Sequence, residues 1–131
     1  MTSKSVFTRA ELAYLHGGRR LGRVATVGKD STPHVVPVGW MHNRELDTID
    51  IGGHGLERTK KYRDVQRTGR AGIVIDDLES TDPWRPRGVE VRGAAEAIPL
   101  PTPLIRIQPE RIVSWGLGVP RSARTVAPDR R

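Results

Sequence analysis

Short stretches in which apolar and polar residues alternate recur along the chain, and many of the apolar positions are β-branched. The clearest is 88–97, where Val89, Val91, Gly93, Ala95 and Ala97 share one face. Turn residues such as Gly28-Lys29-Asp30-Ser31 separate these stretches, which is typical of a hairpin-rich sheet. The pattern predicts strands at 21–27, 33–41, 48–51, 71–75, 88–97, 104–107 and 111–115.

Two segments have helical signals instead. Thr8-Arg9-Ala10-Glu11 has the spacing of a capping box, and the helix it starts is expected to stop at Gly17-Gly18. A second, basic helix is predicted over 56–67. About six short strands with only two short helices favour a mainly β barrel over a parallel α/β sheet.

Prolines and charges predict the irregular parts of the chain. Pro33 and Pro37 favour a sheet edge, a strand start or a bulge for the second strand, because proline donates no ladder hydrogen bond, and the gap in pairing at Pro37 could hold a ligand. The polar, proline-bearing segment 76–86 is expected to be a loop. The last residues, 118–131, carry arginines and no apolar period, which predicts a disordered basic tail after a folded domain over 1–117.

Composition narrows the class of protein. The chain has no cysteine, which excludes disulfides and thiolate chemistry, and its start has no apolar stretch typical of a secretory signal. No apolar run is long enough for a membrane helix, so we expect a cytoplasmic protein. Only 36% of its 131 residues are hydrophobic, which predicts a modest core completed at a homodimer interface. The net charge of +7 suits a phosphate-bearing partner.

The segment after the third predicted strand is the first candidate site. Gly52 and Gly53 allow close approach to the backbone, and the helix predicted after them carries Thr59, Lys60 and Lys61 in its first half. Free amides at a helix start, a hydroxyl and two ammonium groups suit a phosphate. A solvated helix face is the alternative interpretation, and the glycine spacing matches neither a Walker loop nor a dinucleotide fingerprint.

The second candidate is the segment 82–87, where Trp84 lies beside Arg85 and Arg87 and could stack on a planar ring while gripping an anion. A rigid surface loop pinned by two prolines is the alternative. The four histidines lack metal-ligand spacing, so each is interpreted as structural and no metal is expected. No pair of groups forms an acid–base dyad, so no catalytic residue is assigned and any hard chemistry belongs to a cofactor.

Several segments resemble the pyridoxamine 5′-phosphate oxidase-like superfamily of FMN-binding split barrels. They are GRVATVGKDSTPHVVPVGW (22–40), TIDIGG (48–53), TKKYRDV (59–65), VIDDLESTDPWRPRGVEVRG (74–93) and IRIQPERIVSWGL (105–117). Within it, the chain looks closest to the actinobacterial branch of coenzyme F420-dependent enzymes. The resemblance implies a six-stranded antiparallel split β-barrel with short flanking helices, and a homodimer with the cofactor in a groove between subunits.

The resemblance also implies cofactor-binding positions. The phosphate would be held by Thr59, Lys60 and Lys61, with Arg63 a further candidate. The ring would lie along Ala25, Thr26, Val27, Pro37, Val38, Ile51, Gly52 and Gly53. Lys29, Arg85 and Arg87 are the candidates for the acidic tail of F420.

The implied activity is that of an oxidoreductase transferring hydride between the deazaflavin and a small conjugated organic substrate. A protein of the same fold that holds FMN, haem or the deazaflavin without turnover is the alternative. The charge also permits a nucleic-acid partner, but aromatic residues are only 5% of the chain and no strand interleaves them with basic residues, which disfavours one.

Overall fold

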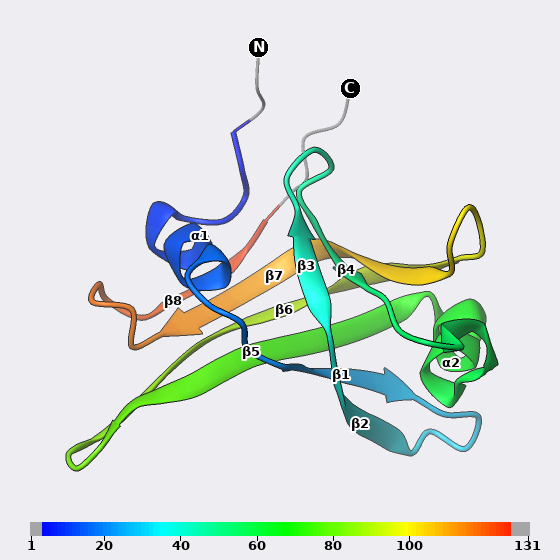
Figure 1. Ribbon diagram of the computed structural model, residues 1–131, viewed down its shortest axis with the longest axis horizontal. Helices are drawn as coiled ribbons and strands as arrows, with labels where there is room; N and C mark the ends of the chain where they lie inside the picture. Colours follow the sequence, from blue (N-terminus) through cyan, green and yellow to red (C-terminus); the bar gives the residue numbers. More distant parts are fainter. Residues whose placement is uncertain (1–3, 127–131) are drawn as a thin grey trace.

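The computed structural model describes residues 4–126, which form one curled antiparallel sheet with short helices at its two ends (Figure 1). The elements are α1 (Arg9–His16), β1 (Gly22–Val27), β2 (Pro33–Val38), β3 (Trp40–Asn43), β4 (Thr48–Ile51), the 3₁₀ helix η1 (Leu56–Arg58), α2 (Lys60–Thr68), β5 (Arg70–Thr81), β6 (Trp84–Ile98), β7 (Leu104–Trp115) and β8 (Ser122–Thr125).

The strand order explains the split barrel. Neighbouring strands run β2-β1-β5-β6-β7-β4-β3, and β8 adds to β7. The first and last strands of this order, β2 and β3, follow each other in the chain and are separated by Gly39 alone. The sheet therefore curls until its two edges come together at one residue, which confirms the predicted split-barrel fold, with eight strands in the described residues. Pro33 and Pro37 lie on the edge strand β2, the first of the three positions that the prolines favoured.

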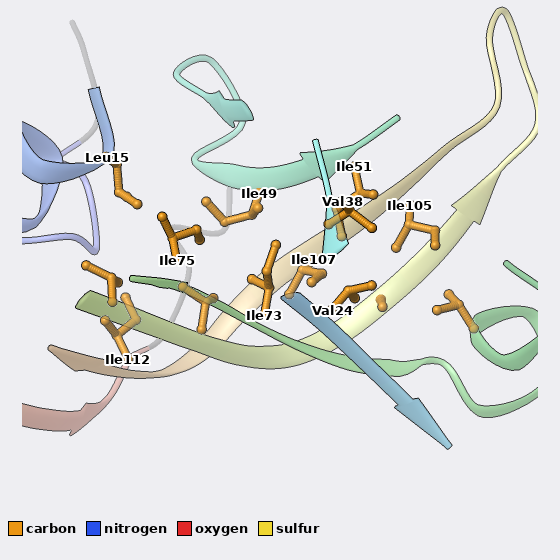
Figure 2. Packing of buried hydrophobic residues seen from close by; sticks show 14 of the residues in the cluster. Leu15, Val24, Val38, Ile49, Ile51, Ile73, Ile75, Ile105, Ile107 and Ile112 are labelled. Atoms are coloured by element: carbon orange, nitrogen blue, oxygen red, sulfur yellow. The ribbon is translucent and has the colours of Figure 1, made fainter. Parts of the chain in front are cut away.

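Isoleucine and valine fill the inside of the curled sheet (Figure 2). Along β1 the side chains alternate strictly, so that Val24 is 1% exposed while Arg23 and Ala25 point outward. Burying each such side chain contributes about 1.5–3 kcal/mol. The inner layer is completed by Ile49, Ile51, Ile73, Ile75, Val89, Val91, Ile105, Ile107 and Ile112, all at most 2% exposed.

The predicted loop at 76–86 is wrong, because the chain there is the end of a long hairpin. β5 continues to Thr81 and β6 begins at Trp84, with a register shift between Leu78 and Ser80. This arm projects beyond the core in Figure 1, and most of its residues from 78 to 86 are exposed. Both faces of the arm are solvated, so its sequence lacks the alternation by which a half-buried strand is recognised.

The last two predicted strands form one strand, β7. Pro109 was expected to separate them, but it lies at the register shift where β6 and β7 slip between Arg92 and Gly93. A proline is tolerated there because the bulge interrupts the ladder of hydrogen bonds. Gly93 is required at this crossing, since a Cβ on it would lie 1.9 Å from the Gln108 carbonyl oxygen.

The expectation of a disordered tail is wrong for residues 122–125, which form β8; residues 127–131 lie outside the described part. Arg124 reaches back to α1 and binds the fully buried carboxylate of Glu11, with Nη2 2.7 Å from Oε1. The Ser114 hydroxyl donates to the same carboxylate at 2.6 Å. An ion pair between positions 113 residues apart leaves no sequence signal, so the folded domain extends past the predicted boundary at 117.

The predicted helix start at Thr8 is confirmed. Its hydroxyl accepts from the Glu11 amide, and the Glu11 carboxylate accepts from the Thr8 amide. The predicted second helix is two pieces, η1 and α2, divided at Thr59, and α2 ends at Gly69 in the left-handed conformation (φ 68°). Over the described residues 4–126, none of the helices is both long and apolar enough to cross a membrane.

Candidate functional site

A shallow groove of about 430 Å³ runs over the outer face of β1 and β5. The alternation that buries Val24 turns Ala25 and Val27 outward, where Val35 of β2 and Val74 of β5 continue an apolar floor. Gly72 deepens the floor, because a Cβ there would come within 3.3 Å of the Arg92 side chain. Contiguous apolar surface of this kind on a water-facing side of a sheet is typical of a ligand or subunit contact.

Three arginines that the sequence patterns did not single out surround this groove: Arg23, Arg70 and Arg92. Each has an exposed carboxylate partner, at 2.6 Å for Arg23 with Asp76, 2.9 Å for Arg70 with Glu110 and 3.4 Å for Arg92 with Glu90. Such exposed pairs contribute little stability, so a ligand anion can replace the carboxylate at low cost. The sequence did contain a signal for Arg23, because the alternation along β1 puts Arg23 on the same outward face as Ala25.

One end of the groove is organised by a buried carboxylate of α2. Asp64 is 1% exposed and accepts from the Thr26 hydroxyl at 2.8 Å and from Arg67 Nη1 at 3.3 Å, with Lys60 Nζ 3.7 Å away. Burial alone would raise the pKa of Asp64, but these donors and cations outweigh it and hold the pKa below its usual value. Arg67 also donates to the Val27 carbonyl, so this network fixes the start of α2 against the end of β1.

The residues predicted to bind the phosphate differ in how far their polar groups are already hydrogen-bonded within the protein. Lys60 has its Nζ 3.3 Å from the position that a Cβ on Gly28 would take, beside the β1–β2 turn. Lys61 is half-buried in the same helical turn. The Thr59 hydroxyl caps α2, donating to the Leu56 carbonyl at 2.6 Å and accepting from the Tyr62 amide. Arg63 is exposed and donates to the Arg58 carbonyl at 2.9 Å.

The predicted ring-binding residues are only partly brought together. Ala25, Thr26 and Val27 line the groove, although the Thr26 side chain points inward to Asp64. Val38 and Ile51 are 6% and 0% exposed, so their side chains belong to the core and a ligand can meet only their backbone. Pro37 lies exposed on β2, and Gly52 and Gly53 lie exposed after β4, where added Cβ atoms would meet nothing within 4 Å.

The second predicted cluster lies at the other end of the molecule. Trp84 is 68% exposed at the tip of the β5–β6 arm, next to the exposed Arg85, whereas α2 contacts the opposite end of β6 (Figure 1). Ten strand residues separate Trp84 from Ala94, which pairs with the first residue of β5, and at about 3.3 Å per residue this is roughly 33 Å. A single chain therefore does not join this cluster to the basic start of α2.

Arg87 is already bound to Asp77. Its Nε and Nη2 donate to the two oxygens of Asp77 at 2.8 and 3.1 Å, and the Tyr14 hydroxyl donates to Asp77 at 2.8 Å. These hydrogen bonds, that of Arg87 above all, hold the pKa of Asp77 at about 2. Burial and the neighbouring Asp77 carboxylate raise the pKa of Tyr14. The network ties α1 to the base of the arm, which the sequence alone did not indicate.

This chain belongs to the pyridoxamine 5′-phosphate oxidase family, which it matches over residues 8–131. A relative from Streptomyces rimosus, named as a 5a,11a-dehydrotetracycline/5a,11a-dehydrooxytetracycline reductase, is 38% identical over 120 residues, which span 85% of this chain and 84% of the relative. The match includes nearly the whole described domain.

Solved structures share the fold at lower identity. A conserved hypothetical protein from Mycobacterium tuberculosis superimposes with a TM-score of 0.69 at 20% identity, over 95% of this chain and 99% of the other. A haem-binding protein from Mycobacterium smegmatis gives 0.68 at 15% identity, over 93% of this chain and 60% of the other. A structure titled F420 reductase gives 0.57 at 20% identity, over 76% and 94%. At these identities the likeness concerns the fold alone.

Proposed function

We propose that this protein is an oxidoreductase that binds coenzyme F420 and transfers hydride between this deazaflavin and a small conjugated organic substrate. The observation that carries the proposal is the apolar groove on β1 and β5, with the basic helix α2 packed against the end of β1. The name of the Streptomyces relative supports the reductase chemistry, and the structure titled F420 reductase supports the cofactor.

The residues present fit such a cofactor. The outward side chains of Ala25 and Val27, with Gly72 between strands, leave a flat apolar surface on which a planar ring can lie. Lys60 and Lys61 are the first two residues of α2, and their ammonium groups together with the amides of a helix start suit a phosphate. Lys29, in the turn beside Lys60, suits the acidic tail. When bound, the deazaflavin supplies the hydride chemistry, and the protein positions the ring and excludes water.

We further propose that the protein acts as a homodimer. Within one chain, Trp84 and Arg85 lie roughly 33 Å along β6 from the end that contacts α2, by the usual strand rise. Only the arm of a second subunit can bring these residues to the groove, and the apolar groove floor is a surface that such an interface would cover. Arg87 would join the site only by leaving Asp77.

The alternative is a protein that holds FMN, haem or the deazaflavin without turnover. The haem-binding protein of the same fold keeps this alternative open. The groove itself supports it equally, because the surface that holds a ring is the same with or without catalysis. Reduction of the bound cofactor, followed by exposure to candidate enone acceptors, separates the two functions.

The decisive experiment is a pair of fluorescence titrations of ligand-free protein, one with F420 and one with FMN. Tight binding of F420 alone supports the proposal, preference for FMN contradicts the choice of cofactor, and binding of neither contradicts the cofactor site. Lys61→Ala should weaken F420 binding by about 1–3 kcal/mol, as for a lost charged hydrogen bond. The matched control is Lys4→Ala, an exposed lysine before α1; equal affinity of the two variants would remove Lys61 from the site.

A further inference from the structure

Two of the four histidines form a hydrogen-bonded chain with a carboxylate, on the side of the molecule where α1 meets β3. His16 Nε2 lies 2.9 Å from His42 Nδ1, and His42 Nε2 lies 2.8 Å from Asp47 Oδ1. His42 is buried at 9% exposed, whereas His16 is exposed. These hydrogen bonds therefore lead from a half-buried carboxylate to an imidazole that reaches solvent.

The hydrogen bonds determine where the protons lie. Asp47 accepts from the Ser5 hydroxyl and the Val6 amide as well as from His42. Burial would raise the pKa of Asp47, but the donors from His42, Val6 and Ser5 outweigh it and keep the pKa low. When both rings are neutral, the ionised Asp47 takes the His42 Nε2 proton, so His42 Nδ1 accepts and His16 donates from Nε2. The first added proton then goes to His16 Nδ1, where it breaks none of these bonds.

A pocket of about 510 Å³ lies beside these hydrogen-bonded groups, and both histidines line it. Its charged lining is otherwise Arg19, Arg20 and Arg44, and no carboxylate is among the described lining residues. Arg20 is held by the Tyr14 carbonyl and lies 3.5 Å from Asp77. Arg19 and Arg44 form no ion pair with any described residue, unlike Arg23, Arg70 or Arg92 around the groove.

The pocket also has an apolar wall. Trp40 is half-buried, with its indole N–H donated to the Arg20 carbonyl, and Met41 is 57% exposed beside it. Gly39, between β2 and β3, adds open space because a Cβ there would meet nothing within 4 Å. A volume larger than a simple ion, a wall of Trp40 and Met41, and unpaired guanidiniums suit an organic acid.

We propose that this pocket is a second ligand site, which binds the carboxylate or phosphate group of a small organic acid together with one proton held on His16. The guanidiniums of Arg19 and Arg44 attract the anion, and protonated His16 Nδ1 donates to it. Asp47 and His42 orient His16 as a carboxylate orients a metal-bound histidine. The empty pocket disfavours the proton, because burial, Arg44 and His42 lower the pKa of His16. A bound anion cancels the effect of Arg44, so binding and protonation assist each other.

The test uses NMR of the histidine ring protons, with benzoate and inorganic phosphate as the two probes. The His16 signal is assigned from the His16→Gln variant. We expect either anion to raise the pKa of His16 by about one unit. Benzoate, which is ionised throughout this range, should bind about tenfold more tightly near pH 5.5 than near pH 8. Binding of benzoate alone identifies a carboxylate ligand with an apolar body, and binding of phosphate alone identifies a phosphate ester.

Variants distinguish a built site from general positive charge. Arg44→Gln should weaken binding about tenfold at the lower pH, the loss expected for one charge-assisted hydrogen bond. Arg9→Gln removes the same charge from the exposed start of α1 and should leave the affinity unchanged. His16→Gln should remove the pH dependence. Absence of binding by both anions, an affinity that is the same at both pH values, or equal losses in Arg44→Gln and Arg9→Gln would each overturn the proposal.

Discussion

Replacing Arg124 with methionine tests the ion pair that attaches β8 to α1. The Glu11 carboxylate is fully buried and has four donors: Arg124 Nη1 and Nη2 at 2.9 and 2.7 Å, the Ser114 hydroxyl at 2.6 Å and the Thr8 amide at 2.9 Å. Arg124→Met leaves a buried charge with two neutral donors, which ordinarily costs about 3–5 kcal/mol. Because the Arg124 side chain is 27% exposed, water can partly replace it, so we expect about 3 kcal/mol, near the lower limit of that range.

Equilibrium urea unfolding, followed by circular dichroism, gives the free energy of unfolding for each variant. Arg121→Met is the matched control, since Arg121 is exposed in the same segment and should change stability by less than about 0.5 kcal/mol. A loss below about 1 kcal/mol for Arg124→Met would equal that of a surface pair and would refute the buried ion pair. Adding Glu11→Gln to Arg124→Met should restore part of the stability by removing the unpaired charge.

The same pair predicts a dependence on pH. Burial would raise the pKa of Glu11, but Arg124, Ser114 and the Thr8 amide outweigh it, so the folded pKa lies below the unpaired value of 4.5. A depressed folded pKa stabilises the protein above pH 4.5, and this stabilisation is lost as the pH falls through the folded value. Other carboxylates titrate in the same range, so the measured quantity is the difference between wild type and Arg124→Met. We expect this difference to shrink on acidification; a constant difference would contradict the linkage.

Three further predictions concern the groove, the arm and the bulge. Gly93→Ala should lower stability by about 2 kcal/mol or more, because the new Cβ meets the Gln108 backbone, whereas Gly52→Ala in open space should cost under about 1 kcal/mol; equal melting temperatures would contradict this. Trp84→Ala should weaken cofactor binding more than it lowers the melting temperature, since Trp84 is 68% exposed; a large fall in melting temperature with unchanged affinity would make it structural. Light scattering at micromolar concentration should give twice the chain mass of 14.5 kDa, and a monomer would count against the shared groove.

The elements that the sequence predicted well are those whose signals are local. The capping box at Thr8 and Glu11 involves residues three apart, and the alternation in 22–27 records one buried face. Pro33 and Pro37 limited the second strand to an edge, a strand start or a bulge, because a missing N–H is a property of the residue itself, and β2 is an edge strand. Family resemblance added the split-barrel topology, which strand patterns alone leave open. For the site, the resemblance named Ala25 and Val27 as ring-binding positions, and both line the groove.

What the sequence missed depends on contacts between distant residues. The pattern at 76–86 has no alternation because the arm extends past the core, and only the pairing of β5 with β6 shows that it is a hairpin. Segments around Arg23, Arg70 and Arg92 are far apart in the chain, and curling of the sheet collects them around one groove.

The sequence by itself therefore determined the local structure: where the first helix starts, which strand lacks backbone donors and which residues alternate in and out. Only the tertiary structure decided which of the predicted site residues are free to bind. It placed Lys60 beside the β1–β2 turn and 3.7 Å from Asp64, used the Thr59 hydroxyl as a helix cap, and paired Arg87 with Asp77. It also assigned Arg124 to Glu11, which turned a predicted tail into a strand. The physical reason is that secondary structure depends on neighbouring residues, which the sequence shows directly. A charged side chain meets a distant partner only when folding brings the two together.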